Sequence, residues 1–134
     1  MPDKVVHFEL PADNLERAQR FYHESFGWSM NPETGVQYTM VGTTEVDPQT
    51  RRPKEPGAIN GGMLKRQDPI RQPVITINVA SIDEAAKKIE RAGGKVIRKR
   101  QPVGQAGFAA YFQDTEGNVL GLWELAGAPP SKKK

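Results

Sequence analysis

The feature that most constrains the fold of this chain is an internal repeat of one local pattern. Both halves contain, in the same order, a strand residue, a helix N-cap, a carboxylate three positions later and a helix-ending glycine. The matched pairs are His7 and Val74, Asp13 and Ser81, Glu16 and Glu84, and Gly27 and Gly94, at offsets of 67, 68, 68 and 67 residues. Such constant offsets indicate duplication of one strand–helix–three-strand unit. Because one unit alone would expose a face of its sheet, the two units are expected to pair.

The first half opens with a strand and a helix. Polar and apolar residues alternate over 5–10, which is typical of a half-buried strand. A helix is expected over 13–26, with Asp13 as its N-cap. Apolar residues recur at helical spacing along this segment, which places Tyr22 and Phe26 in the core.

Further strands of the first half are expected at 28–30, 36–41 and 59–65. The segment between the last two, residues 42–58, contains three prolines and no periodicity, and we expect a long loop. Loops of this length are often lids, binding loops or disordered segments. Gly61 and Gly62 lie inside the last strand, where glycine often marks a bulge or the close approach of another group.

The second half repeats this order. We expect a strand over 73–79, a helix from the cap Ser81 to Gly93, and strands over 95–99, 108–113 and 119–124. Residues 1–126 should therefore form a single α+β domain of two tandem βαβββ modules, about 4–66 and 72–125. Residues 127–134, rich in proline and lysine, should form a disordered tail.

Composition narrows the cellular setting. The 134 residues suit one domain and include no cysteine, which excludes disulfides and cysteine-ligated metals. The absence of cysteine fits a reducing cytoplasm. No apolar segment follows a basic start, and no run approaches about 18 apolar residues. We therefore predict a cytoplasmic protein without a signal peptide or a membrane-spanning helix.

The charge pattern argues against nucleic acid as a partner. The formal net charge is +3, but Lys132, Lys133 and Lys134 lie together at the end of the chain, so the remainder is near neutral. A second basic cluster over 95–100 is interpreted as a solvated strand edge, where lysine and arginine discourage edge pairing. No nucleic-acid-reading motif accompanies either group.

Several segments together resemble the vicinal oxygen chelate superfamily, which includes glyoxalases, bleomycin-resistance proteins and extradiol dioxygenases. They are His7–Leu10, Asp13–Trp28, Asp83–Gly94 and Gly107–Trp123, and within the last the run Phe112–Asn118 is similar to the family's "DPxGN" strand–turn ending. Thr115 stands where that ending usually has proline. The resemblance implies a mixed sheet curled into an open, U-shaped barrel, with helices on the convex face and a small-molecule ligand in the concave cavity. It also implies a homodimer.

The resemblance further implies four metal-ligand positions, on the first and last strands of each module, filled by His, Gln or Glu and suited to divalent metals. In this chain these positions hold His7, Val74, Gly121 and a residue of the Gly61–Gly62–Met63 segment. One match in four predicts that the usual metal site is absent and that no cofactor is needed. Glu124 would be an alternative metal ligand after a strand bulge, but its parity places it with Leu120 and Leu122 on the helix-packed side.

A metal-free polar site is the remaining prediction. His7 and Glu9 share one face of the first strand and form a candidate general acid/base pair, with ordinary polar sheet lining as the alternative. Thr76 and Asn78 hold the equivalent face of the duplicated strand. Trp123 serves either as an apolar cavity wall or in core or dimer packing.

Three functions are compatible with these patterns. The one we favour is a glyoxalase-like protein that binds a small molecule in the concave cavity without the usual metal. The alternative is a lyase, isomerase or dioxygenase of the same superfamily, either metal-dependent or using His7 and Glu9 without metal. The third is an accessory domain. Ordering of the 42–58 loop over the cavity when ligand is added would favour the first two.

Overall fold

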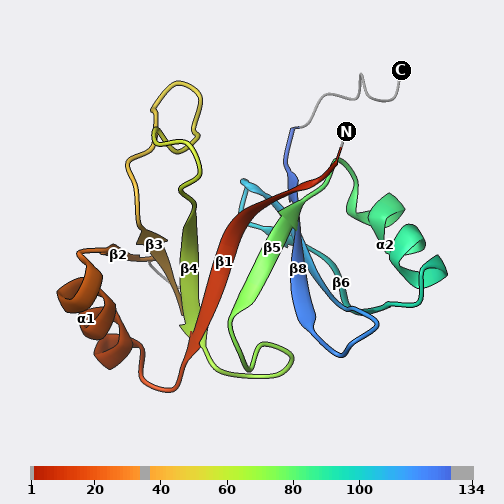
Figure 1. The fold of residues 1–134 in the computed structure, drawn as a ribbon, viewed down its shortest axis with the longest axis horizontal. Coiled ribbons are helices and arrows are strands. Elements are labelled where there is room, and N and C mark those ends of the chain that lie inside the picture. Colours follow the sequence, from red (N-terminus) through yellow and green to blue (C-terminus); the bar gives the residue numbers. More distant parts are fainter. Residues whose placement is uncertain (1, 34–36, 128–134) are drawn as a thin grey trace. The chain divides into compact units, whose positions relative to one another are not determined.

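The computed structural model describes residues 2–33 and 37–127 and divides them into two compact units, Val6–Val74 and the remaining described residues. Figure 1 labels the elements of both units. The elements of the first are β1 (Lys4–Ala12), α1 (Leu15–Phe26), β2 (Ser29–Pro32), β3 (Tyr38–Gly42) and β4 (Asn60–Lys65). Those of the second are β5 (Val74–Asn78), α2 (Ile82–Arg91), β6 (Lys95–Val103), β7 (Gly107–Gln113) and β8 (Val119–Leu125).

The two modules have the same topology. Read from its first strand, the first module has the strand order β1-β4-β3-β2, with β1 parallel to β4 and the other pairs antiparallel. In the second the order is β5-β8-β7-β6 read from its first strand, with β5 parallel to β8 and the other pairs antiparallel. The prediction of an α+β fold built from two βαβββ modules of mixed sheet is confirmed. The assignment of residues 1–126 to a single domain stays a prediction.

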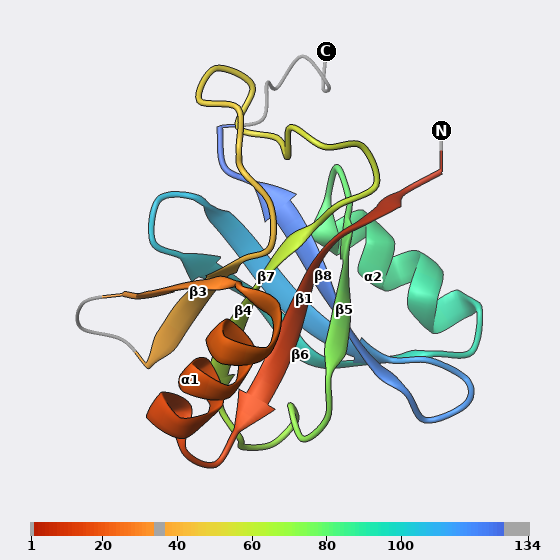
Figure 2. The same cartoon turned by 60° about the vertical axis from the view of Figure 1, so that its left-hand side comes forward.

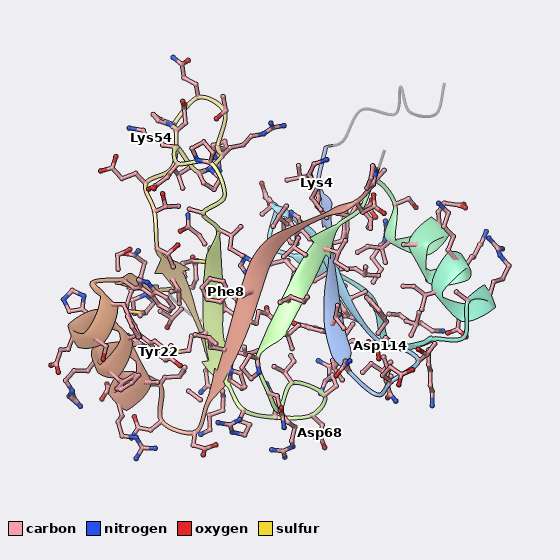
Figure 3. The ribbon with its side chains drawn as sticks, viewed as in Figure 1. Lys4, Phe8, Tyr22, Lys54, Asp68 and Asp114 are labelled. Carbon is pink, nitrogen blue, oxygen red and sulfur yellow. The ribbon has the colours of Figure 1, made fainter. Side chains whose placement is uncertain are left out.

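In the first module the core lies between α1 and the sheet (Figure 2). Its buried centre is Ala12, Val41 and Met63. Partly buried side chains packed on this centre come from β1, α1, β2 and the residue before β2; they are Phe8, Leu10, Leu15, Ala18, Tyr22, Trp28 and Met30. The rings of Tyr22 and Trp28 stack with their centroids 5.2 Å apart. Phe8 and Tyr22 can be followed in Figure 3.

The prediction that Phe26 belongs to the core is wrong, because 61% of its surface is exposed. Helical periodicity identifies a stripe of residues but not where the sheet beneath the helix ends. Phe26 is the last residue of α1, and its ring meets Trp28 at a centroid distance of 5.5 Å without being covered.

The second module has an equivalent core under α2. Val79, Ile82, Ala110, Phe112 and Leu122 are buried, and Ile77, Ala85, Ile89, Phe108 and Leu120 pack against them. The N-cap is Ser81, as predicted, and its side chain accepts a hydrogen bond from the Glu84 amide. The turn after β7 is held by Asp114 (Figure 3), whose carboxylate accepts from the amides of Glu116 and Asn118 at 2.8 and 2.9 Å.

The N-cap of α1 is Asn14 rather than Asp13, which corrects the predicted start of this helix. Asn14 has the extended conformation of a cap, with φ −131° and ψ 105°, and its side chain accepts from the Arg17 amide at 2.9 Å. Asp13 instead forms an ion pair with Arg66 at 2.8 Å. Either residue type can cap a helix. Arg66, which lies just beyond β4 and far from Asp13 in the sequence, binds the aspartate and leaves Asn14 as the cap.

Replacing Asn14 by alanine is expected to lower the free energy of unfolding by about 1 kcal/mol, because the amide of Arg17 loses its acceptor. Urea denaturation measures the change. Asp13→Ala, which removes an exposed ion pair, is the matched control and should cost less than about 0.5 kcal/mol. A larger loss at Asp13 than at Asn14 would contradict this assignment of the cap.

The loop between β3 and β4 carries hydrogen bonds of its own. Val46 bridges to Pro53, and the Asp47 carboxylate accepts from the amides of Gln49 and Thr50. Where the loop returns to the sheet, the Asn60 side chain accepts from the amide of Thr43 at 2.7 Å. Lys54 marks the protruding part of this loop in Figure 3. The predicted long loop is therefore an internally bonded segment.

No helix in the described part of the chain is long and apolar enough to cross a membrane. The predicted disordered tail lies outside the described residues, apart from Gly127. The predicted strand over 36–41 corresponds to β3, which begins at Tyr38, while Val36 lies outside the described residues.

Candidate functional site

The alternation of β1 separates its polar and apolar side chains. Phe8 and Leu10 pack toward α1 in the core of the first module. His7 and Glu9 therefore lie on the opposite face of the strand, as their spacing predicted. Glu9 is 8% exposed, which is rare for a carboxylate without a hydrogen-bond donor close by.

Tyr38 joins these two side chains. Its hydroxyl donates to Oε2 of Glu9 at 3.0 Å, and the tyrosine hydroxyl oxygen also lies 2.9 Å from Nε2 of His7. Tyr38 is the first residue of β3, a strand separated from β1 by β4. Tyr38 could not be predicted from the sequence, because no local pattern shows that its ring crosses a neighbouring strand.

Gly62 explains how the ring crosses β4. Gly62 pairs with Glu9 across the parallel β1–β4 ladder. A Cβ atom on Gly62 would lie 1.9 Å from the Tyr38 hydroxyl oxygen and 2.1 Å from Cζ, far closer than atoms can approach. The phenol therefore lies directly over this glycine. The two adjacent glycines inside an expected strand were the one sequence signal of this close approach.

The proton positions follow from the chemistry of the three groups. Tyr38 has one hydroxyl proton and donates it to the Glu9 carboxylate. The tyrosine oxygen can then only accept from His7, so His7 carries its proton on Nε2 and a lone pair on Nδ1. Burial lowers the pKa of His7, and the nearby Glu9 carboxylate opposes this with a smaller effect. The imidazole is therefore neutral at pH 7.

The other predicted cavity residues belong to the second module. Thr76 is 6% exposed and pairs with Gly121, where a Cβ would lie 2.8 Å from the threonine hydroxyl oxygen. Asn78 pairs with Trp123 and is half-buried. The indole of Trp123 lies over Gly107 of β7. A Cβ atom added to Gly107 would lie 2.7 Å from the indole ring. Each half thus has a glycine on its last strand overlaid by a hydroxyl-bearing side chain.

Glu124 lies at the N-terminus of α2. Its Oε1 accepts from the amide of Ile82 at 2.8 Å, and its Oε2 lies 3.4 Å from the Arg100 guanidinium. A helix N-terminus offers unpaired amides and favours a negative charge, so this carboxylate has a structural role. Its neighbours Leu120 and Leu122 pack in the core of the second module, as strand parity predicted.

The residues at the family's metal-ligand positions do not fit a metal. Val74, Gly62 and Gly121 have no donor atom in their side chains, and the space over both glycines is filled by hydroxyl groups. His7 is held at Nε2 by Tyr38. Over residues 2–33 and 37–127 there is no group of three or more His, Cys, Asp or Glu side chains that could hold a metal ion.

The arrangement can accept a hydrogen bond or a proton at His7. A proton taken up at Nδ1 would create an imidazolium whose Nε2–H points at a tyrosine already bonded to a carboxylate. Such a chain stabilises the positive charge and fixes the orientation of the ring. Together, His7, Tyr38 and Glu9 can orient a polar ligand or act as a general base.

Comparisons with known proteins identify one family. The sequence model of the Glyoxalase/Bleomycin resistance protein/Dioxygenase superfamily matches residues 4–122. A protein of Mycobacterium bovis named "Putative glyoxylase CFP32" is 27% identical over 120 residues, which cover 87% of this chain and 43% of that protein. The chain thus spans less than half the length of this curated relative.

Two solved structures share the fold. Methylmalonyl-CoA epimerase from Mycobacterium tuberculosis matches with a TM-score of 0.62 and 14% identity, covering 97% of this chain and 91% of that one. A methylmalonyl-CoA epimerase in complex with methylmalonyl-CoA and an ammonium ion matches with a TM-score of 0.65 and 17% identity, covering 96% and 98%. At these identities the likeness shows the fold alone.

Proposed function

The chain belongs to the Glyoxalase/Bleomycin resistance protein/Dioxygenase superfamily, and we propose that it binds a small polar molecule at His7, Tyr38 and Glu9 without the metal that the family resemblance implies. The observation that carries this proposal is the single hydroxyl of Tyr38 between an imidazole and a buried carboxylate. Burying a carboxylate costs free energy, and a sheet gains nothing structural from this charge that an apolar residue would not supply. We infer that Glu9 is present, despite the free-energy cost of burying its carboxylate, because it contributes to ligand binding.

The second module supports the same function. On the equivalent face of its first strand Thr76 and Asn78 supply a hydroxyl and an amide, and Trp123 of β8, the ladder partner of Asn78, supplies an indole; these are the groups that orient small ligands in largely apolar sites. The neighbouring epimerase structure holds a coenzyme A ester, so this fold accommodates small molecules in at least one protein. Assembly as a homodimer and a cytoplasmic location stay predictions.

Elemental analysis of the untagged protein, purified without chelators, tests the metal-free site, with His7→Ala as a parallel sample. We expect less than about 0.1 equivalent of any transition metal in both proteins, because one histidine and one carboxylate are too few ligands. Near-stoichiometric metal that disappears in His7→Ala would refute the proposal. A fragment screen by NMR on the same two proteins then tests binding, and ligands of the site should be lost in His7→Ala.

A second candidate function is metal-free proton transfer, as in an isomerase or lyase. The hydrogen-bond chain from His7 Nε2 through Tyr38 to Glu9 favours it, since this chain would stabilise a protonated His7. An enzyme of this kind would exchange a carbon-bound proton of its ligand with deuterium in D₂O. Exchange that is lost in both His7→Ala and Tyr38→Phe would support catalysis over binding.

A further inference from the structure

We propose that the ligand presents a hydrogen-bond donor, a hydroxyl or an ammonium group, to Nδ1 of His7. This inference rests on the proposed function and names the chemical class of molecule that the site selects. It follows from the hydrogen bond that Tyr38 donates to Glu9, because a phenol has a single proton to donate.

The ring of His7 has one open position. Within residues 2–33 and 37–127 its only hydrogen bond is the one from Nε2 to Tyr38. No buried side-chain nitrogen or oxygen among these residues lacks a partner, so solvent reaches Nδ1. Nδ1 is therefore accessible and holds a lone pair, and a ligand that reaches it must donate.

Tyr38 and Gly62 fix this polarity. If Nδ1 carried the proton, Nε2 would be an acceptor, and the single tyrosine proton could not serve both Nε2 and the Glu9 carboxylate. The phenol cannot turn toward a different partner without leaving the surface of Gly62 on which it lies. The backbone position of a glycine thus determines which nitrogen of His7 faces the ligand.

The charge of the site favours the same class of ligand. The Glu9 carboxylate acts electrostatically on His7, where its negative charge favours a positive one. That carboxylate is buried, so water screens its charge weakly. An anionic ligand at Nδ1 would meet a lone pair and a nearby negative charge, whereas an ammonium group would be attracted by both.

The test uses nitrogen NMR of the ¹⁵N-labelled 134-residue chain at pH 7.5. The chain has two histidines, His7 and His23, and His7→Ala assigns their ring signals. The probes are benzyl alcohol, benzylamine and benzoate, which share a ring and differ in the polar group. We expect a proton on Nε2 of His7, and binding of the alcohol and the amine at least about tenfold tighter than of benzoate, the factor that one hydrogen bond supplies.

Each outcome decides the inference. Donor probes that move the Nδ1 signal of His7, with the effect reduced in Tyr38→Phe, support it. A proton on Nδ1, or tighter binding of benzoate, overturns the ligand class while leaving small-molecule binding intact. If these probes and a wider fragment set leave every signal of this face unchanged, the proposed function fails together with the inference.

Discussion

Replacing Met63 by alanine is expected to lower the free energy of unfolding by about 2–5 kcal/mol, the range for truncating a large core side chain. Met63 has 0% of its surface exposed and lies with Ala12 and Val41 at the centre of the first module. Removal of its side chain loses transfer free energy and leaves a cavity that strands on both sides prevent from closing. Thr39 of β3 and Leu10 of β1 are its ladder partners.

Met40→Ala provides a matched control, because it removes the same side chain from the same sheet. Met40 lies on β3 and is 40% exposed, so its loss should cost less than about 1 kcal/mol. Urea denaturation followed by tryptophan fluorescence, with unchanged slopes, gives both values. Similar losses at the two methionines would contradict the placement of the core around Met63.

The parts of the fold that local sequence determines were predicted well. Alternation located β1 and β5, the Ser81 cap located α2, and the constant offsets located the duplication. These features depend on residues close together in the chain, for which periodicity and capping chemistry are direct physical signals. The cap of α1 was predicted wrongly because Asp13 and Asn14 are equally suitable caps. The ion pair between Asp13 and Arg66, which is distant in sequence, leaves Asn14 as the cap.

The candidate site could be predicted only in part, for the same reason. His7 and Glu9 are two residues apart on one strand, so their common face follows from strand geometry. Tyr38 joins them through the register of β1 on β4 and of β3 on β4, pairings that connect residues up to 53 positions apart. Ladder register is a tertiary property, and a shift of one residue would turn the side chains to the opposite face.

The role of the two glycines on the last strands, Gly62 and Gly121, can be recognised only in the structure. In the sequence, Gly62 and Gly121 have no side chain that could act as a ligand at the positions where the family resemblance implies a metal site. In the structure each is the surface on which a hydroxyl-bearing side chain lies, Tyr38 in the first module and Thr76 in the second. Hydroxyl groups therefore lie where the family resemblance implies metal ligands, in both modules.

Replacing Gly62 by alanine is expected to destabilise the protein by about 1–3 kcal/mol and to weaken binding of the donor probes by about tenfold or more. The three atoms nearest to the added methyl would all belong to Tyr38, at 1.9, 2.1 and 2.4 Å, so the phenol must move away. His7 and Glu9 then lose the hydroxyl that joins them, and the buried carboxylate loses a donor.

A double-mutant cycle separates this mechanism from general damage to the strand. In a Tyr38→Ala background the obstacle is gone, and alanine is intrinsically better than glycine within a strand by about 0.5–1 kcal/mol. Gly62→Ala should therefore change from destabilising to neutral or stabilising when Tyr38 is absent. Gly42→Ala, whose closest atom would be the small, rotatable hydroxyl of Ser29, should show no such dependence on Tyr38. If Gly62→Ala costs the same in both backgrounds, the phenol does not determine the need for glycine, and the fixed polarity of His7 loses its structural basis.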